Sequence, residues 1–436
     1  MRMTLPAMLR CPLCEADIRI QDIYEDTPEA LIHGSLQCEC DTYPVCHGVL
    51  ILKNSPVKKY VLRFLEERAF KQAALFAMAN YADDICRLLN YVESFKVGKL
   101  IRAGVLRAVT AYLNTRYAKY FDKNISLMEL LGDGAYDQYL RHRFSSQTFW
   151  SLYPFVSLIR SKGGRILEVC CGSGHASFVL SRSIPPEKLI GIDGDFRNLY
   201  LAEKYFSQAD FIQADMNAGL PFKDHQFSVS FMMDSFHYID SRALLAKELI
   251  RVTVPEGFNL ILHLHNALRE NVSAGRPLLP AALQRIFRDD DILLVPEKEV
   301  IENFIQNGRL DISGKYTETQ IREADAVIVA RHVPAAIVED LRDDLLLPDD
   351  HLIINPMYRT EDREDHILLT RIFPSDAFRR EYPLTEAFLP DRYEIKKAVL
   401  REGRDPLSKE FREMRRKFIL ISVPGCYGGK DPFDLI

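Results

Sequence analysis

The stretch RILEVCCGSGHASFVL, at residues 165–180, is the feature that most constrains the fold of this 436-residue chain. Ile166, Leu167 and Val169 predict a short buried strand, after which Gly172 and Gly174 turn the chain into an apolar helix. A strand, a glycine turn and a helix together bring bare backbone close to a ligand at the helix amino terminus. The sequence therefore predicts an α/β domain with a ligand site at this turn.

The glycine turn alone does not identify the ligand, because GSGH is neither the GxGxxG of dinucleotide-binding folds nor a P-loop. Four apolar segments follow the turn at the spacing of βαβ units, and they end at Asp193, Asp215, Asp234 and His265. Parallel strands would place these polar ends along one edge of a sheet. There Asp193 could accept hydrogen bonds from two ribose hydroxyls, and Asp215 with Met216 would suit an adenine ring.

The joint pattern of residues 136–270 resembles the class I S-adenosylmethionine-dependent methyltransferases, particularly those that act on small molecules. The matching motifs are LEVCCGSG at 167–174, GID at 191–193, AD at 214–215, LPFKDHQFSVSF at 220–231 and LIRVTVPEGFNLIL at 249–262. This family implies a Rossmann-like sheet of seven strands with the last antiparallel, and S-adenosyl-L-methionine as cofactor. It assigns Glu168, Gly172 and Gly174 to the methionyl part. It assigns Asp193 to the ribose, and Asp215 with Met216 to adenine.

Neighbouring segments extend the resemblance to residues 132–332. YDQYLRHRFSS is similar to the helix that covers the cofactor in small-molecule methyltransferases, so Arg143 is the candidate partner of the methionyl carboxylate, with a surface arginine as the alternative. EVIENFIQNGRLDIS and ADAVIVARH predict a helix with strands six and seven. Pro255-Glu256-Gly257 stands where the family has a turn of proline and two glycines. HNALRENVSAGRPLLPAALQRIF is expected to form a lid or a substrate loop.

Methyl transfer from a sulfonium is an in-line displacement, so the enzyme mainly aligns the acceptor and needs a base only when the acceptor loses a proton. MMDSFHYID places Asp234 and His237 just after the fourth strand, where acceptor and methyl group should meet. His237 is the candidate base, because an imidazole titrates near neutrality. A packing role is the alternative, and His175, His263 and His265 compete for the role of base.

Five of the nine cysteines lie in the first 46 residues. In a cytoplasmic chain such clustering favours a metal site over disulfides. The candidate ligands are Cys11, Cys14, Cys38 and Cys40, which would form a closed, structural Zn²⁺ site. Cys46 or His47 could replace one of them. With the following YPV and GVLIL, this segment resembles the zinc-ribbon module that accompanies many methyltransferases.

The rest of the chain predicts a division into a zinc ribbon at 1–56, a helical connector at 57–131, the cofactor-binding domain at 132–332 and an α+β domain at 333–436. The last domain is expected to be a cap over the acceptor pocket, a dimer surface or a packing appendage. The helix in KEFREMRRKF is interpreted as a solvated face rather than a phosphate site.

The net charge of −5 argues against nucleic acid as the default partner. No apolar stretch approaches the roughly 18–20 residues that span a bilayer, and MRMTLPAMLRCPLC lacks the pattern of a signal peptide, so the protein is expected in the cytoplasm. No Asn/Asp-Pro-Pro-Tyr/Phe motif follows strand four, and in this family that motif marks methylation of nitrogens in nucleic acids and proteins. The resemblance therefore implies a small-molecule acceptor, and a specialised biosynthetic pathway is the expected setting. The alternatives are an RNA methyltransferase with zinc-ribbon recognition and a non-catalytic cofactor-binding scaffold or sensor.

Overall fold

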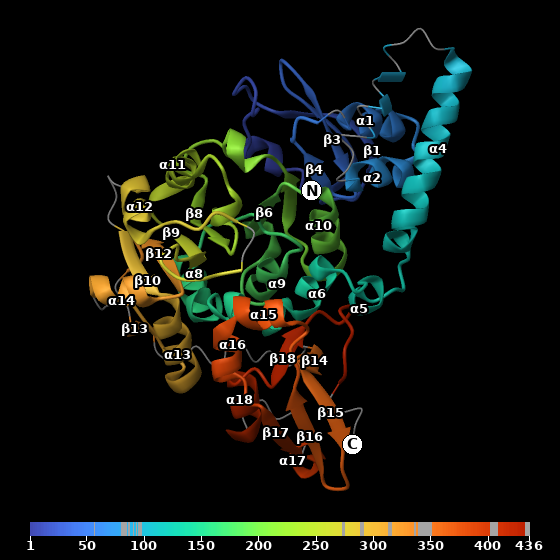
Figure 1. Ribbon diagram of the computed structural model, residues 1–436. Helices are drawn as coiled ribbons and strands as arrows, with labels where there is room; N and C mark the ends of the chain where they lie inside the picture. The colour runs from blue at the N-terminus through green and yellow to red at the C-terminus, as the bar shows by residue number, and fades with distance from the viewer. Residues whose placement is uncertain are drawn as a thin grey trace.

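A central mixed sheet with helices on both faces organises the protein, and a smaller α+β part from the end of the chain lies against it (Figure 1). The computed structural model describes residues 1–55, 57–79, 85, 88–89, 91–92, 94, 98–272, 275–287, 292–312, 316–334, 337–338, 351–401 and 409–431. No helix in these ranges combines the length and the apolar character needed to cross a membrane.

The central sheet has the strand order β1-β2-β3-β4-β7-β6-β5-β8-β9-β12-β10. Its strands are β1 (Arg19–Asp26), β2 (Leu31–Gln37), β3 (Thr42–Cys46), β4 (Val49–Ile51), β5 (Ile166–Val169), β6 (Leu189–Asp193), β7 (Asp210–Gln213), β8 (Phe227–Met233), β9 (Thr253–His265), β10 (Ile292–Pro296) and β12 (Ala326–Arg331). Neighbours from β7 through β9 are parallel, whereas β12 is antiparallel to both β9 and β10. The chain order reverses at β5, the point where parallel sheets open a crevice for a ligand.

Residues 19–51 continue the central sheet, which is a correction to the predicted seven strands. Leu50 of β4 lies opposite Ile212 of β7 in a parallel pair, and β1, β2 and β3 follow as antiparallel neighbours. The three residues of β4 are buried. An apolar strand of this kind gains most by pairing with the open edge at β7, because an uncovered edge leaves backbone groups unpaired.

The sixth strand of the predicted domain also lies elsewhere in the sequence than expected. RLDIS was assigned to it, but this segment forms β11 (Leu310–Asp311), which pairs with β13 (Ile337–Val338) in a separate small sheet. The position beside β12 belongs to β10, which precedes the helix instead of following it. Both segments are short and apolar, so their pattern alone does not decide which one pairs with β12.

The segment Pro255-Glu256-Gly257 lies inside the long strand β9 rather than in a turn before it. The pairing of β8 with β9 shifts register across this segment. A Cβ atom on Gly257 would lie 2.6 Å from the carbonyl oxygen of Ser228. The glycine therefore permits a bulge that brings the two backbones close together.

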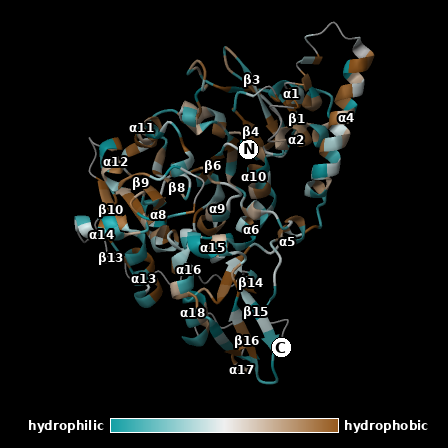
Figure 2. Cartoon of the chain, in the orientation of Figure 1, coloured by the Kyte–Doolittle hydropathy of each residue, from teal (hydrophilic) through white to brown (hydrophobic). Residues whose placement is uncertain are grey.

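Alternating strand residues divide the core between the two faces of the sheet. Ile166 packs on one face, and Leu167 and Val169 pack on the other. The first face is covered by α8 (Val156–Lys162), α9 (His175–Ser181), α10 (Phe196–Leu201) and α13 (Glu297–Asn307). The second is covered by α11 (Arg242–Val252), α12 (Pro280–Ile286) and the first residues of the chain. Figure 2 shows the apolar character of strands such as β9 and β10 against the mixed helices.

Helices occupy most of the described part of residues 57–131, as the periodicity predicts. They are α1 (Lys58–Glu66), α2 (Phe70–Met78), α4 (Lys99–Tyr117) and α5 (Leu127–Leu130). α1 packs on α2 and on β3, with Phe64 and Phe76 in ring contact at 5.1 Å. α4 stands along one side of the molecule (Figure 1). This region therefore rests on the continuation of the sheet.

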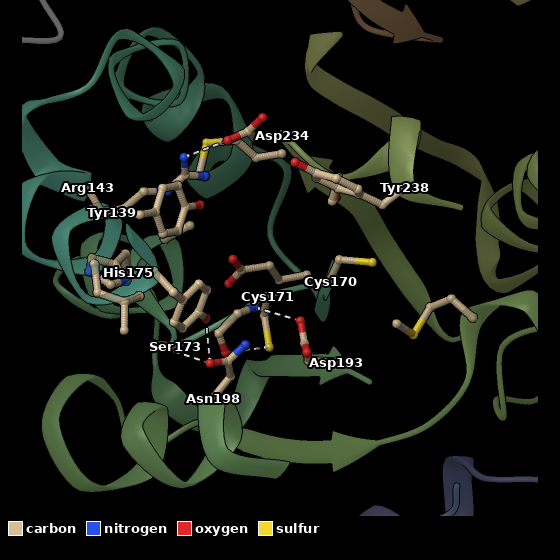
Figure 3. A pocket seen from close by; sticks show the side chains of 18 of the residues that line it. Tyr139, Arg143, Cys170, Cys171, Ser173, His175, Asp193, Asn198, Asp234 and Tyr238 are labelled. Atoms are coloured by element: carbon tan, nitrogen blue, oxygen red, sulfur yellow. Dashed lines mark hydrogen bonds and ion pairs between the residues drawn. The ribbon is translucent and has the colours of Figure 1, made fainter. Parts of the chain in front are cut away.

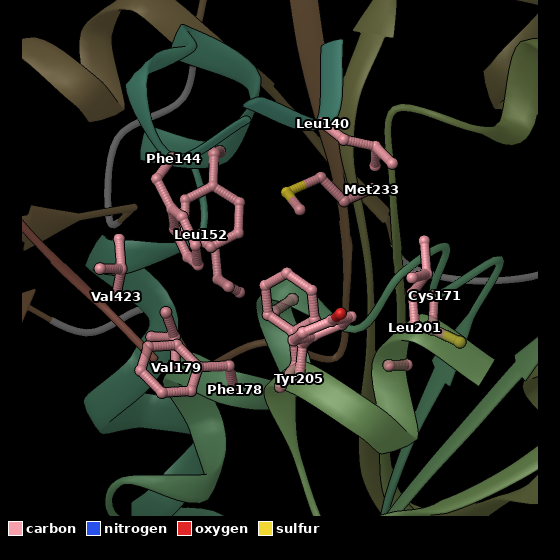
Figure 4. Packing of buried hydrophobic residues seen from close by; sticks show 14 of the residues in the cluster. Leu140, Phe144, Leu152, Cys171, Phe178, Val179, Leu201, Tyr205, Met233 and Val423 are labelled. Atoms are coloured by element: carbon pink, nitrogen blue, oxygen red, sulfur yellow. The ribbon is translucent and has the colours of Figure 1, made fainter. Parts of the chain in front are cut away.

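Residues 351–431 form two small sheets with helices. The elements are β14 (His351–Ile354), β15 (Tyr358–Asp362), β16 (His366–Arg371), β17 (Arg392–Lys396), β18 (Leu420–Val423), α15 (Asp376–Glu381), α16 (Pro383–Phe388), α17 (Lys397–Arg401) and α18 (Lys409–Arg416). Phe418 stacks on Trp150 at 4.4 Å, and the Tyr427 hydroxyl donates to the carbonyl of Leu140 at 3.0 Å. Val423 belongs to the same buried cluster as Phe144 (Figure 4), so this part shares a core with the helices over the sheet.

Candidate functional site

A cavity of about 550 Å³ lies beyond the carboxyl ends of β5, β6 and β8. This volume is typical of sites for small molecules, which run from roughly 300 to 1,000 Å³. α6 (Ala135–His142) and α15 supply the opposite wall. Figure 3 shows Asp193 on one side of the cavity, with Arg143 and Asp234 across from it. Parallel strands have thus brought residues distant in sequence to one edge, as predicted.

The two glycines of the turn have different structural roles. Both have a positive φ, +53° for Gly172 and +81° for Gly174. A Cβ on Gly174 would lie 2.8 Å from the Cβ of Ala202, so this glycine is required for packing against the helix that follows β6. No atom of the described residues lies within 4 Å of a Cβ built on Gly172. Gly172 therefore exposes backbone to the cavity.

Asp193 at the end of β6 holds the glycine turn. Its Oδ2 accepts from the N–H of Gly172 at 2.9 Å, and its Oδ1 accepts from the N–H of Asp195 at 2.9 Å. Burial raises the pKa of Asp193 to about 6, although these backbone donors favour the ionised form. Each carboxylate oxygen has a second lone pair, so the side chain can still accept from a ligand in the cavity.

Glu168 lies at the floor of the cavity and is 6% exposed. Its Oε2 accepts from the Ser177 hydroxyl at 2.5 Å. Burial raises the pKa of Glu168 to about 8, against the opposing effects of Ser177 and the positive charge of Arg143. The side chain is therefore mostly protonated at neutral pH when the cavity holds no ligand.

This raised pKa predicts a pH-dependent contribution of Glu168 to stability. Below pH 4.5 the group is protonated in both states, and as the pH rises toward 8 only the unfolded state ionises freely, so folding is progressively disfavoured. The Glu168→Gln variant has no carboxyl group to ionise at this position, so it should not lose stability in this way as the pH rises. The free energy of unfolding of the variant, relative to the natural protein, should rise by roughly 3–5 kcal/mol from pH 4.5 to pH 8. Urea denaturation at the two pH values measures this difference, and parallel pH profiles would contradict the assignment.

Arg143 and Asp234 form a buried ion pair at the opposite side of the cavity. Nη1 of Arg143 lies 2.9 Å from Oδ2 of Asp234 and also donates to Thr148 Oγ1 at 2.6 Å. Burial alone would raise the pKa of Asp234, but positive charge on His263 and Arg143 lowers it. Arg143 is thus not a surface arginine, and Asp234 is held as an anion.

The predicted base His237 lies behind this wall. It is 2% exposed and does not line the cavity, although its neighbour Tyr238 does. Burial lowers the pKa of His237 to about 4 and that of His265 to about 3. His263 differs, because the Glu297 carboxylate at 2.8 Å raises its pKa against the effect of burial.

The adenine candidates Asp215 and Met216 are separated by the structure. Met216 is buried and lines the cavity. Asp215 is exposed, and its Oδ1 accepts from the N–H of Asn217 at 3.0 Å, which caps a short helix. Asp215 is therefore not brought together with Asp193, Met216 and the glycine turn.

Several lining residues carry no motif that the sequence could reveal. They are Tyr136, Tyr139, Asn198, Glu381 and Tyr382. The Tyr136 hydroxyl donates to Oδ1 of Asn198 at 2.5 Å, and the Tyr139 ring lies 4.9 Å from the Arg143 guanidinium. Glu381 and Tyr382 come from α15 and the residue after it, so only the docking of the carboxyl-terminal part reveals them.

The candidate zinc ligands converge as predicted, with all four sulfur atoms within 4.8 Å of one another. Cys11 and Cys40 are 3.6 Å apart, Cys38 and Cys40 3.5 Å, and Cys14 and Cys38 3.9 Å. Zn–S bonds of about 2.3 Å place sulfurs about 3.8 Å apart in a tetrahedron, so the donor set fits zinc. The alternative ligand Cys46 is instead buried in the core of β3.

Residues 166–257 match the family described as "Methyltransferase domain". The chain is 29% identical over 104 residues to phthiotriol/phenolphthiotriol dimycocerosates methyltransferase 1 of Mycobacterium ulcerans, a match that covers 23% of this chain and 38% of that protein. It is 26% identical over 121 residues to demethylmenaquinone methyltransferase of Thermotoga maritima, which covers 28% of this chain and 52% of that protein. The chain thus spans about half or less of the length of these relatives.

Solved structures of similar proteins include an S-adenosylmethionine-dependent methyltransferase of Aquifex aeolicus, with 18% identity and a TM-score of 0.31, over 44% of this chain and 97% of that one. A possible histamine N-methyltransferase of Thermotoga maritima has the same identity and TM-score over 44% of this chain and 91% of that one. The glycine turn, Asp193 and Asp234 all lie within the matched residues 166–257. Residues 166–257 of the chain are therefore similar to a methyltransferase domain.

Proposed function

We propose that the chain transfers a methyl group from S-adenosyl-L-methionine to a small-molecule acceptor. The observation that carries the proposal is the cavity at the strand ends, where the bare backbone of Gly172 meets the carboxylate of Asp193 within a matched methyltransferase domain. Backbone donors at a glycine turn and an acidic residue at the next strand are the features that an adenosyl ligand needs.

The cofactor would lie with its adenosyl part beside Asp193 and Met216, and its methionyl part against Gly172 and Glu168. The free lone pairs of Asp193 would accept from the ribose hydroxyls. A methionyl ammonium near Glu168 would favour ionisation of that buried carboxyl. Asp215 remains a candidate for the adenine amino group, from which its Oδ2 would accept a hydrogen bond while Oδ1 keeps the capping bond to Asn217.

Arg143 remains the candidate for the methionyl carboxylate. Among the described residues its hydrogen bonds run through Nη1, to Thr148 and Asp234. The remaining guanidinium nitrogens would donate to the carboxylate. Arg143 would thereby join the cofactor to Asp234, which we place at the acceptor side of the cavity.

A small acceptor is supported by the enclosure of the cavity and by the names of the relatives. Tyr139 and Tyr382 both line the wall opposite the strand ends, so an acceptor has to fit between these rings and the edge of the sheet. The relatives are named for menaquinone and for phthiotriol-type lipids rather than for nucleic acids. Because Glu381 and Tyr382 line the site, we propose that residues 333–436 act as a cap over it. In this proposal residues 1–56 are the zinc ribbon, 57–131 the connector and 132–332 the catalytic domain.

Replacement of Asp193 by alanine tests the cofactor assignment. The change removes both acceptors for the ribose hydroxyls and the bond that holds Gly172, and hydrogen bonds to a charged group contribute about 1.5–3 kcal/mol each. We expect S-adenosylhomocysteine to bind at least about 100-fold more weakly, or about 2.7 kcal/mol, by isothermal titration calorimetry. Asp224→Ala, which removes an exposed carboxylate outside the cavity, is the matched control and should leave the affinity unchanged. Equal affinity of Asp193→Ala and the natural protein would remove Asp193 from the site.

The acceptor class is tested by incubating the protein with labelled S-adenosylmethionine and fractions of cell extract. We expect label in fractions of low molecular mass, where mass spectrometry can identify the product. Label confined to RNA would support the RNA methyltransferase instead. Tight cofactor binding without label in any fraction would support a non-catalytic sensor.

A further inference from the structure

Three polar side chains meet at the wall of the cavity that Asp234 forms. Asp234 follows β8, His237 lies in the short helix η8 (Phe236–Tyr238), and His265 ends β9. Their ligand atoms all lie within 4.8 Å of one another. Asp234 lines the cavity, whereas His237 and His265 are 2% and 5% exposed just behind it. The proposed cofactor contacts use neither histidine.

The two imidazoles are buried, and three of their four ring nitrogens lack a hydrogen-bond partner among the described residues. In the described part of the chain, no hydrogen-bond partner is present for either ring nitrogen of His237 or for Nε2 of His265. The N–H of Arg276 donates to the His237 carbonyl at 2.8 Å, so the segment after β9 closes over this histidine. Buried polar atoms in folded proteins are almost always paired, so unpaired nitrogens that lie within 4.8 Å of one another call for a ligand.

We propose that Asp234, His237 and His265 bind one divalent transition-metal ion at the acceptor end of the cavity. Two histidines and one carboxylate are a ligand set for such ions, and the set leaves coordination positions open. Because Asp234 also lines the cavity, an open position can face an oxygen or nitrogen atom of the acceptor. Contact between the ion and the acceptor rests on the proposed methyl transfer, whereas binding of the ion does not.

The three side chains need to move only slightly to bind one ion together. Nε2 of His265 lies 4.0 Å from Oδ1 of Asp234, and the rings of His237 and His265 are 4.8 Å apart at an angle of 74°. Ligand atoms at about 2.0–2.2 Å from one ion lie roughly 3–3.6 Å from each other. Movements of about 1 Å or less per side chain would therefore close the site.

The charges around the cluster also fit a cation. Asp234 is ionised, and Arg143 bonds its Oδ2, which leaves Oδ1 on the side of His265. A neutral imidazole offers the lone pair of one ring nitrogen to a metal ion, so each histidine can act as a ligand. The Arg143 guanidinium and the positive charge on His263 both oppose a further cation, and the Glu297 carboxylate at 2.8 Å offsets the charge on His263. The Glu381 carboxylate, which interacts with Asp234 and Arg143, offsets part of that opposition.

A metal ion at this position would make an alcohol or enol acceptor reactive. Binding to the ion lowers the pKa of a hydroxyl group, so its proton is lost to solvent and a metal-bound oxygen anion remains. The anion attacks the methyl carbon as the carbon–sulfur bond of the sulfonium breaks, which leaves a neutral thioether and a methyl ether. His237 would then act as a metal ligand and not as the base.

Metal content tests the site without reference to activity. The full chain is stripped with a chelator, reloaded with Co²⁺ and analysed by mass spectrometry of the metal and by absorption spectroscopy. We expect two ions per chain, one with the intense sulfur-to-cobalt band of the cysteine site and one with the weaker bands of nitrogen and oxygen ligands. His265→Gln and Asp234→Asn should lose the second ion and keep the first. His366→Gln, on an exposed hairpin, should keep both.

Each outcome decides the proposal. A natural chain that binds one ion with sulfur ligands only would overturn it, as would an Asp234→Asn variant that binds the second ion within tenfold of the natural affinity. Retention of the sulfur-bound ion in both variants shows that they are folded. If S-adenosylhomocysteine fails to bind while two ions do, the proposed function fails and the metal site stands.

Discussion

Loss of the amino-terminal zinc ion is expected to lower the thermal stability of the whole protein. The cysteine cluster closes the turns next to β1–β4, and β4 pairs directly with β7 of the central sheet. Structural zinc contributes about 10–16 kcal/mol to the folding of isolated small domains, and part of this free energy should reach the shared sheet. Replacing Cys14 and Cys40 by serine should therefore lower Tm by roughly 5–10 °C, which corresponds to about 5–9 kcal/mol in a chain of 436 residues.

The two cysteines are suited to the test because both are exposed, so serine adds no buried polar group. Calorimetry gives Tm, and metal analysis shows whether the sulfur-bound ion is lost. Cys426→Ser is the matched control, since this exposed cysteine lies outside the cluster and its Sγ donates to the Tyr205 carbonyl, a bond that a serine hydroxyl can also make. A double variant with natural Tm and natural zinc content would exclude the cysteine site.

The exchange of Gly172 for asparagine is expected to abolish cofactor binding while the protein stays folded. Asparagine tolerates the positive φ of this position, and its side chain would enter the empty space where the cofactor is proposed to lie. Binding of S-adenosylhomocysteine should become undetectable by calorimetry, with a change in Tm of a few degrees at most.

Gly174→Ala is the matched comparison for this change. Its methyl group would meet Ala202 at 2.8 Å, so it should destabilise the protein by about 1–3 kcal/mol. Any folded fraction of this variant should still bind the cofactor. The two glycines thus separate the ligand contact from the packing contact. Natural affinity in Gly172→Asn would place the cofactor elsewhere.

The local features of the site could be predicted from the sequence. Gly172, Gly174 and Asp193 are close in the chain to the strands that carry them, and the βαβ pattern fixes which ends of the strands face the site. The convergence of Cys11, Cys14, Cys38 and Cys40 followed from their spacing in the same way. Asp215 shows the limit of this approach, because an acidic residue at a strand end can cap the next turn as readily as it can face a ligand.

Features that depend on long-range docking could not be predicted. The pairing of β4 with β7 joins residues about 160 positions apart, and the sequences of the two strands do not specify that they pair with each other. Tyr382 reaches the cavity only because the carboxyl-terminal part docks through contacts such as Gln147 with Leu384. The approach of His265 to Asp234 is different, because the sequence predicts that these neighbouring strands are parallel; β9 runs three residues beyond its last pair with β8, which is Leu262 with Met233.

The measurement that tests the central claim most directly is a crystal structure of the protein grown with S-adenosylhomocysteine. The account predicts the ribose hydroxyls within hydrogen-bonding distance of Asp193, adenine against Met216 and the amino-acid end beside Gly172 and Glu168. A ligand bound away from these residues, or side chains that fill the space beside Gly172, would contradict it.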